Sequence, residues 1–272
     1  MKPRLAAPPG ACDTHIHIFD RRYKTAPTAF FQPPHRPLED YLAMHRELGL
    51  SRVIVVQTSV YGFDNGCVLE SMAAIGAAAR GVVVVPVDVD EAELDHLTKL
   101  GVRGVRFFML KGGVLPWEAL EPLAAKVRPF GWHVQLQLDG RDLPQYEKRL
   151  AALPVDLVID HVGKFLEPVP PTDPAFKCLL RLLDGGRCSV KLAAPYETSK
   201  SGPPHFEDVG VLARELVRTH PERCLWASNW PHPNRPENPS NAAMLDLLLE
   251  WADDDATRKA ILVDNPARVY GF

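Results

Sequence analysis

The stretch Asp13-Thr14-His15-Ile16-His17 opens the fold, and Ser228-Asn229-Trp230-Pro231-His232 closes it. Side chains two positions apart on a strand share a face, so His15 and His17 point the same way, with Asp13 beneath them. Two polar rings on one inward face need hydrogen-bond partners or a chemical role. We therefore interpret His15 and His17 as a catalytic or ligand-binding pair, rather than as hydrogen-bonded core histidines.

Eight short runs of β-branched or apolar residues recur along the chain. They span residues 12–18, 52–57, 82–88, 102–108, 132–138, 156–161, 188–193 and 224–229. Stretches of helical period lie between them, most clearly at residues 38–49, 118–130, 142–153, 206–220 and 241–252. This alternation predicts an α/β fold, a single-domain (β/α)8 TIM barrel over residues 12–272 that follows an N-terminal extension of residues 1–11. An open doubly wound sheet is the alternative, but no G-x-G-x-x-G motif follows any run.

Composition excludes several classes of protein. The chain has 272 residues, and a barrel of this kind needs about 250. Its net charge of −3 carries no run of like charges, so we expect no nucleic-acid partner and no membrane partner. Five cysteines without a C-x-x-C spacing predict reduced thiols and a cytoplasmic location. Because residues 1–11 contain no apolar stretch, we do not expect them to be a signal peptide, and the sequence leaves open whether the protein forms a homo-oligomer.

In such barrels the chemistry lies at the C-terminal ends of the strands. Arg106 ends the fourth run, where its guanidinium fork suits a carboxylate, whereas Arg103 has the opposite phase and should face the helices. The fifth run alternates cleanly and places His133, Gln135 and Gln137 on one face. We expect Gln137, nearest the mouth, to contact substrate, and His133 to be a core histidine.

Other polar residues follow the remaining runs. His161 closes the sixth run and is expected to be catalytic, whereas Asp160 should turn away from the interior. Three residues in loops are candidate rim contacts, namely Thr58, Ser59 and His232. The role of Lys191, in mid-strand, is left open, and the long loop of residues 19–37 is expected to act as a lid.

Five motifs carry a family resemblance: CDTHIHIFD (12–20), GVRGVRF (101–107), IDHVGK (159–164), SNWPHP (228–233) and NPARVYGF (265–272). Over nearly the whole chain they resemble the amidohydrolase superfamily, and within it the branch of 2-pyrone-4,6-dicarboxylate lactonases. The resemblance implies a (β/α)8 barrel that hydrolyses a lactone ester without a metal. It further implies that His15, His17 and His161 polarise the lactone carbonyl, while Arg106 and Lys200 hold substrate carboxylates.

The chain departs from the metal-dependent members of this superfamily. Those members add a lysine or glutamate on the fourth strand, a histidine on the fifth and an aspartate on the eighth. Here the places hold Arg106, Gln135 or Gln137, and Asn229. Three neutral histidines can still bind zinc. Without an anionic ligand on the last strand, we expect no cofactor, with zinc as the less favoured alternative.

Asn229 also departs from the lactonases, whose last-strand aspartate activates water. An amide cannot take a proton near neutral pH, and a positioned general base is worth about 10²–10⁴ in rate. An intramolecular hydroxyl nucleophile, with an effective molarity of about 10⁵ M or more, could offset that loss. An engineered replacement of aspartate by asparagine would look the same in the sequence.

We therefore expect metal-independent hydrolysis of the ester bond of a carboxylated lactone, resembling either 2-pyrone-4,6-dicarboxylate or a sugar-diacid lactone. Catalysis is expected from His15, His17, His161 and Asn229. The first alternative is isomerisation between aldarate lactones, which Asn229 favours. A zinc-dependent hydrolase or decarboxylase and a non-catalytic protein that binds organic acids are further alternatives.

Overall fold

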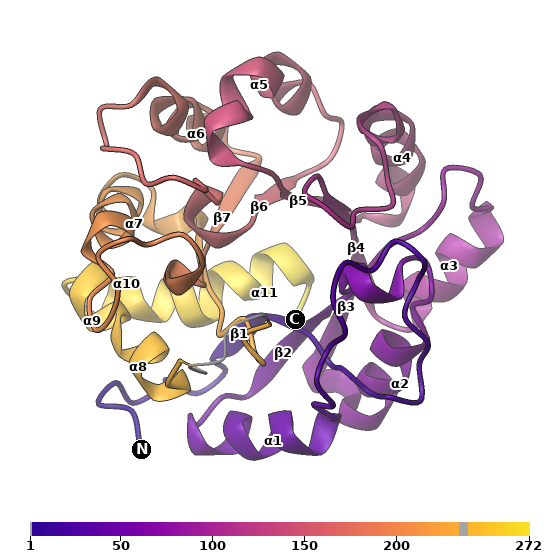
Figure 1. The fold of residues 1–272 in the computed structure, drawn as a ribbon, viewed down its shortest axis with the longest axis horizontal. Coiled ribbons are helices and arrows are strands. Elements are labelled where there is room, and N and C mark those ends of the chain that lie inside the picture. Colours follow the sequence, from indigo (N-terminus) through magenta and orange to yellow (C-terminus); the bar gives the residue numbers. More distant parts are fainter. Residues whose placement is uncertain (1, 234–238) are drawn as a thin grey trace.

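A computed structural model describes residues 2–233 and 239–272 of the chain. Within those residues, eight parallel strands pair in sequence order, with helices outside them (Figure 1). They are β1 (Cys12–Ile16), β2 (Arg52–Val56), β3 (Ala79–Val83), β4 (Val102–Phe108), β5 (His133–Gln137), β6 (Leu157–Ile159), β7 (Cys188–Leu192) and β8 (Cys224–Trp226). A parallel bridge between Ile16 and Trp230 joins the last strand to the first. The predicted (β/α)8 barrel is confirmed.

Helices follow the strands around the ring. They are α1 (Leu38–Glu47), α2 (Gly66–Ile75), α3 (Glu91–Lys99), α4 (Leu120–Val127), α5 (Leu143–Ala151), α6 (Pro174–Asp184), α7 (Glu207–Thr219), α8 (Asn241–Asp246), α9 (Leu248–Trp251), α10 (Asp255–Lys259) and α11 (Asn265–Tyr270). Local sequence sets several of their starts. Asp90 and Asp173 accept backbone N–H groups of the first turns of α3 and α6, as N-cap residues do. None of the helices in the described part of the chain has both the length and the hydrophobicity of a membrane span.

The predicted third strand was displaced along the chain. The sequence predicts a strand over residues 82–88, but β3 covers Ala79–Val83. The first residues of β3 were missed because they include Arg80 and Gly81, and a charged residue and a glycine are not typical of a strand interior. In the fold the Arg80 guanidinium donates to the Gly271 carbonyl, and Gly81 lies under Met72, where a Cβ would meet the sulfur at 2.4 Å.

The prediction that Asp13 lies beneath His15 and His17 was wrong, because β1 contains a β-bulge. The register of β1 on β2 shifts between Asp13 and Ile16, because β1 has one residue more than β2 over this stretch. The side chain of Asp13 therefore lies on the opposite face of the strand from those of His15 and His17. Asp13 pairs with Val53 of the outer apolar cluster, and its carboxylate accepts from the Ser228 hydroxyl and backbone N–H. It therefore does not lie beneath the two histidines on their own face.

The barrel is closed at its N-terminal end by an apolar plug. Its members are Cys12, Ile54, Val56, Val82, Val158, Leu225 and Tyr270, which form a cluster distinct from the larger one between strands and helices. Tyr270 comes from α11, which crosses the middle of the ring of strands in Figure 1. Polar side chains occupy the interior above this plug, toward the C-terminal ends of the strands.

Candidate active site

A cavity of about 330 Å³ opens at the C-terminal ends of the strands. Most of the residues predicted for the site line it: His17, Thr58, Ser59, Arg106, Gln137, His161 and Asn229. They come from the strand ends or the loops that directly follow, the positions at which a parallel barrel gathers side chains. The sequence alone therefore located the mouth of the barrel, because the C-terminal ends of parallel strands meet there.

Three predicted residues do not line the cavity. His15 lies below His17, with no exposed surface and its Nε2 3.1 Å from the Nε2 of His17. His232 is buried behind the wall, where its ring contacts the Tyr196 hydroxyl at 2.8 Å and the Asn241 side chain at 2.8 Å. The side chain of Lys200 is 62% exposed and pairs with Glu167 at 3.3 Å.

The cavity has an apolar wall that sequence analysis did not assign. It is formed by Phe30, Phe31, Phe108, Leu110 and Leu166. Phe30 and Phe31 belong to the long loop of residues 19–37, and their rings meet edge to face at 5.1 Å. The loop predicted to be a lid therefore contributes wall residues, whereas its movement stays a prediction.

Charged residues that the sequence did not single out complete the lining. Lys111 follows β4, Lys164 follows β6, and Glu197 follows β7. Lys164 and Glu197 form an ion pair across the cavity wall. The motif IDHVGK (159–164) includes Lys164. However, strand alternation cannot predict which way a side chain points once the residue lies beyond the end of the strand.

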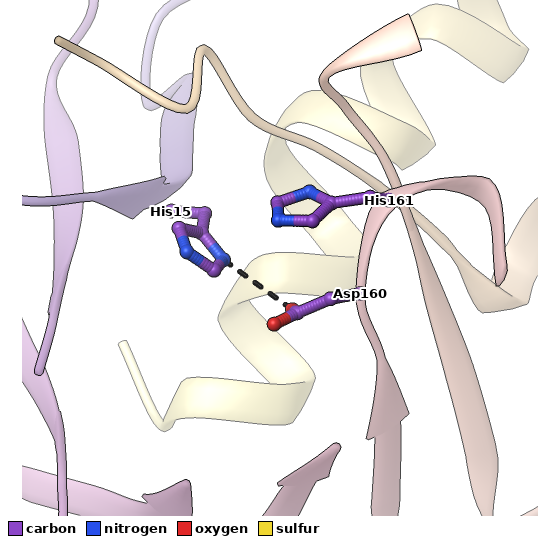
Figure 2. A group of neighbouring side chains, drawn as sticks. All are labelled: His15, Asp160 and His161. Carbon is purple, nitrogen blue, oxygen red and sulfur yellow. Dashed lines mark ion pairs between the residues drawn. The ribbon is translucent and has the colours of Figure 1, made fainter. Parts of the chain in front are cut away.

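A left-handed turn after β6 brings Asp160, His161 and Lys164 to one side of the barrel. His161, Val162, Gly163 and Lys164 all have positive φ values, between 53° and 83°. Asp160 continues the inward phase of Val158, and the left-handed turn then brings His161 inward as well. The prediction that Asp160 turns away from the interior was wrong. Figure 2 shows His15, Asp160 and His161 facing one another, with 3.3 Å between His15 Nδ1 and Asp160 Oδ1.

Burial keeps the histidines of the site neutral. It lowers the pKa of His17 to about 3, and it lowers the pKa of His15 and His161 well below the ordinary value. Burial alone would raise the pKa of Asp160, but the positive charges of Lys191 and Arg106 and the hydrogen bond from Gln135 bring it below its usual value. At neutral pH the site thus holds three neutral imidazoles around a buried carboxylate.

Arg106 is a buried cation of the cavity wall. Its guanidinium donates to the Gln57 carbonyl at 2.7 Å and to the Gln137 amide oxygen at 2.9 Å, and it lies 3.7 Å from Asp160. Its Nε has no hydrogen-bond partner among the described residues. A buried guanidinium with spare donor capacity on a cavity wall suits a carboxylate.

The amide of Asn229 has one fixed orientation. Its nitrogen donates to the Tyr196 hydroxyl at 2.9 Å and to Glu197 Oε1 at 3.0 Å. A carboxylate only accepts, so the amide nitrogen must face Glu197. Its Oδ1 is buried and has no partner within the described part of the chain. Asn229 lines the cavity, and its amide oxygen has the chemistry to accept from a hydroxyl but not to remove its proton.

The side chains that could hold a metal ion are His15, Asp160 and His161, whose donor atoms lie within 4.8 Å of one another. The ammonium of Lys191 lies beside two of them, 3.2 Å from His15 Nδ1 and 3.6 Å from Asp160 Oδ1. A divalent ion placed between these donors would lie against a buried positive charge, which is strongly unfavourable at low dielectric. The donor set as it stands does not fit a metal ion.

Comparison with known proteins gives one consistent family. A sequence model of the amidohydrolase family matches residues 12–272. D-galactarolactone isomerase of Agrobacterium fabrum is 33% identical over 273 residues, which cover 98% of this chain and 93% of that protein. The 2-pyrone-4,6-dicarboxylate hydrolase of Comamonas testosteroni is 32% identical, with coverage of 99% and 92%. A ligand-free crystal structure from Agrobacterium tumefaciens, 33% identical, superposes with a TM-score of 0.94 over 99% of this chain and 98% of that one.

Proposed function

Because the chain belongs to the amidohydrolase family, we propose that it transfers the acyl group of a carboxylated lactone from one oxygen to another without a metal ion. The two relatives are named as an isomerase of D-galactarolactone and a hydrolase of 2-pyrone-4,6-dicarboxylate. Both reactions break the acyl–oxygen bond of a lactone ring. They differ in the nucleophile, which is a substrate hydroxyl in an isomerisation and water in a hydrolysis.

The charges of the cavity support a substrate that carries carboxylates. Arg106, Lys111 and Lys164 lie along its wall, and Thr58 and Ser59 add hydroxyl groups. Carboxylates pair well with these cations in a site that is shielded from water. A cation that faces the lactone carbonyl would also stabilise the oxyanion that forms when the nucleophile attacks.

Asn229 is the residue that favours a substrate hydroxyl over water as the nucleophile. Asn229 lines the cavity, and its Oδ1, which has no partner among the described residues, has the chemistry to accept the hydrogen of a substrate hydroxyl but cannot act as a base for water. A hydroxyl within the substrate has an effective molarity of about 10⁵ M or more, and this advantage over water can offset much of the factor of about 10²–10⁴ in rate that a general base supplies. We therefore favour isomerisation over hydrolysis.

The proton balance of the isomerisation is closed. The hydroxyl oxygen bonds to the carbonyl carbon, the ring carbon–oxygen bond breaks, and the hydroxyl proton ends on the departing ring oxygen. His161 lines the cavity, and its Nδ1 has no hydrogen-bond partner among the described residues. A neutral imidazole there can take the proton from the first oxygen and return it to the second.

Hydrolysis is the second candidate, on one observation. The same free Nδ1 of His161 could take a proton from water instead. A carboxylate would then form, and one proton would be released in each turnover.

Isotope labelling separates the two reactions. The purified enzyme would be incubated in H₂¹⁸O with lactones of aldaric acids and with 2-pyrone-4,6-dicarboxylate, and followed by NMR and mass spectrometry. Isomerisation would interconvert ring forms with no ¹⁸O in the product and no base uptake in a pH-stat. One ¹⁸O and one proton per turnover would establish hydrolysis instead. Activity that disappears on chelation and returns with zinc would contradict the metal-independent mechanism.

A further inference from the structure

Lys191 is a buried cation that the proposed acyl transfer leaves without a role. It lies on β7 with no exposed surface. Its ammonium has three protons and three acceptors: the Thr14 carbonyl at 2.9 Å, Gln135 Oε1 at 2.7 Å and His15 Nδ1 at 3.2 Å. Every proton is therefore directed at an atom of the barrel interior, and none is available to a ligand.

The hydrogen bonds of His17 fix its tautomer. Its Nδ1 lies 2.8 Å from the Val56 carbonyl, which can only accept, so Nδ1 carries the proton. The Nε2 of neutral His17 is consequently an acceptor. Because His15 Nε2 lies 3.1 Å away, His15 must donate from that atom.

The tautomer of His15 follows in turn. With its proton on Nε2, a neutral His15 has a lone pair on Nδ1. The donors that face this lone pair are Lys191 and the amide nitrogen of Gln135, at 3.2 Å and 3.3 Å. Gln135 itself is oriented by Lys191, which occupies its oxygen. Asp160 Oδ1 lies 3.3 Å from the same Nδ1 without a hydrogen bond, as expected between two acceptors.

We propose that the ammonium of Lys191 takes the place of a metal ion beside His15 and Asp160, and thereby holds His15 in the tautomer that donates to His17. Like a metal ion, it engages the His15 Nδ1 lone pair and faces the Asp160 carboxylate. Lys191 is a positioning residue, because it acts on the cavity only through the histidine pair. Without it, Nδ1 of His15 is free to take a proton and donate to Asp160.

The first test is spectroscopic. Proton–nitrogen correlation spectra of the ¹⁵N-histidine-labelled protein at pH 7 should show His15 protonated on Nε2 alone. In Lys191→Met, which removes the charge and keeps the length, Nδ1 of His15 should gain a proton. Lys164→Met, which removes the other buried lysine of the site, should leave His15 unchanged. A wild-type His15 already protonated on Nδ1, or a Lys191→Met spectrum identical to wild type, would overturn the proposal.

The second test asks whether removal of the ammonium creates a metal site. Lys191→Ala should bind one Co²⁺ per chain, with the visible absorption of a low-symmetry complex and at least 100-fold more tightly than wild type. Adding Asp160→Asn should abolish that binding, and Lys164→Ala should not produce it. Equal Co²⁺ affinity in wild type, or none in a folded Lys191→Ala protein, contradicts the proposal.

Both tests are independent of the proposed acyl transfer. Neither needs a substrate, so a wrong lactone chemistry and a wrong role for Lys191 would be told apart. Circular dichroism and thermal unfolding would show whether Lys191→Ala folds. If it does not, the NMR comparison of wild type with Lys191→Met decides the question.

Discussion

Arg106 and Lys200 show how differently two predicted carboxylate ligands are placed. Arg106 is 3% exposed on the cavity wall, held by Gln57 and Gln137. Lys200 lies on the outer surface with Glu167. Both are cations in loops or at strand ends, so residue type alone could not distinguish them.

Their substitution should therefore have different effects. A hydrogen bond to a charged group is worth about 1.5–3 kcal/mol, so Arg106→Met should lower kcat/KM by about 10- to 100-fold, mainly through KM. Lys200→Met should leave kcat/KM within about twofold, since exposed ion pairs contribute little. Steady-state kinetics on the identified lactone would check this. An equal loss in both variants would show that the loop carrying Lys200 closes over bound substrate.

At the scale of elements, two local irregularities assemble the site. The bulge in β1 separates Asp13 from the face of His15 and His17. The left-handed turn after β6 brings Asp160, His161 and Lys164 to one side. Both depart from regular strand alternation, and strained conformations of this kind are often found at functional sites.

Gly163 offers a test of the turn. Its φ is +83°, and a Cβ there would lie 2.7 Å from Phe165 and 2.9 Å from Leu179. Gly163→Ala should thus destabilise the protein by more than the roughly 1–2 kcal/mol cost of a left-handed alanine, and it should lower kcat/KM at least tenfold by displacing His161 and Lys164. Thermal unfolding and kinetics would measure both effects.

Gly131 provides the matched control. It also has a positive φ, of +69°, but a Cβ there would meet nothing within 4 Å. Gly131→Ala should cost only the backbone strain and leave kcat/KM unchanged. Normal activity in Gly163→Ala would mean that the turn tolerates displacement and does not position the catalytic groups.

At the scale of the whole molecule, the barrel buries histidines in their neutral form. His133 is 3% exposed, its ring is 5.3 Å from that of Tyr270, and burial followed by the charge of Lys191 lowers its pKa to about 3. The unfolded chain, with an ordinary pKa of 6.5, then binds more protons at acid pH than the folded one. This contribution to stability is complete above pH 6.5 and is lost as the pH falls toward 3.

The pH dependence of unfolding should reveal this linkage. Between pH 7 and pH 4.5, His133 should account for about 3 kcal/mol of the lost free energy of unfolding. In His133→Leu, which cannot titrate, the loss should be smaller by that amount, as measured by urea denaturation. His96→Gln, at an exposed position on α3, should follow wild type. Parallel curves for His133→Leu and wild type would show that another group controls acid stability.

The sequence alone determined the number and order of the strands and seven of the residues that line the cavity. It could do so because alternation with period two and helical periodicity are local properties, and because a parallel barrel gathers its strand ends at one mouth. Arg106, Gln137 and His161 were found on these grounds. The position of β3 was missed because Arg80 and Gly81 obtain their partners from distant parts of the chain.

Only the tertiary structure decided which groups touch. The bulge in β1 is a property of its register on β2, and the inward turn of His161 depends on the sign of φ, and neither is written in the alternation of residues. The contacts of Lys191 join β1, β5 and β7, which are brought together only when the sheet closes. Residue type supplied the candidate charges, and barrel closure determined which of them became partners, because electrostatic and hydrogen-bond energies depend on distances that the chain acquires only on folding.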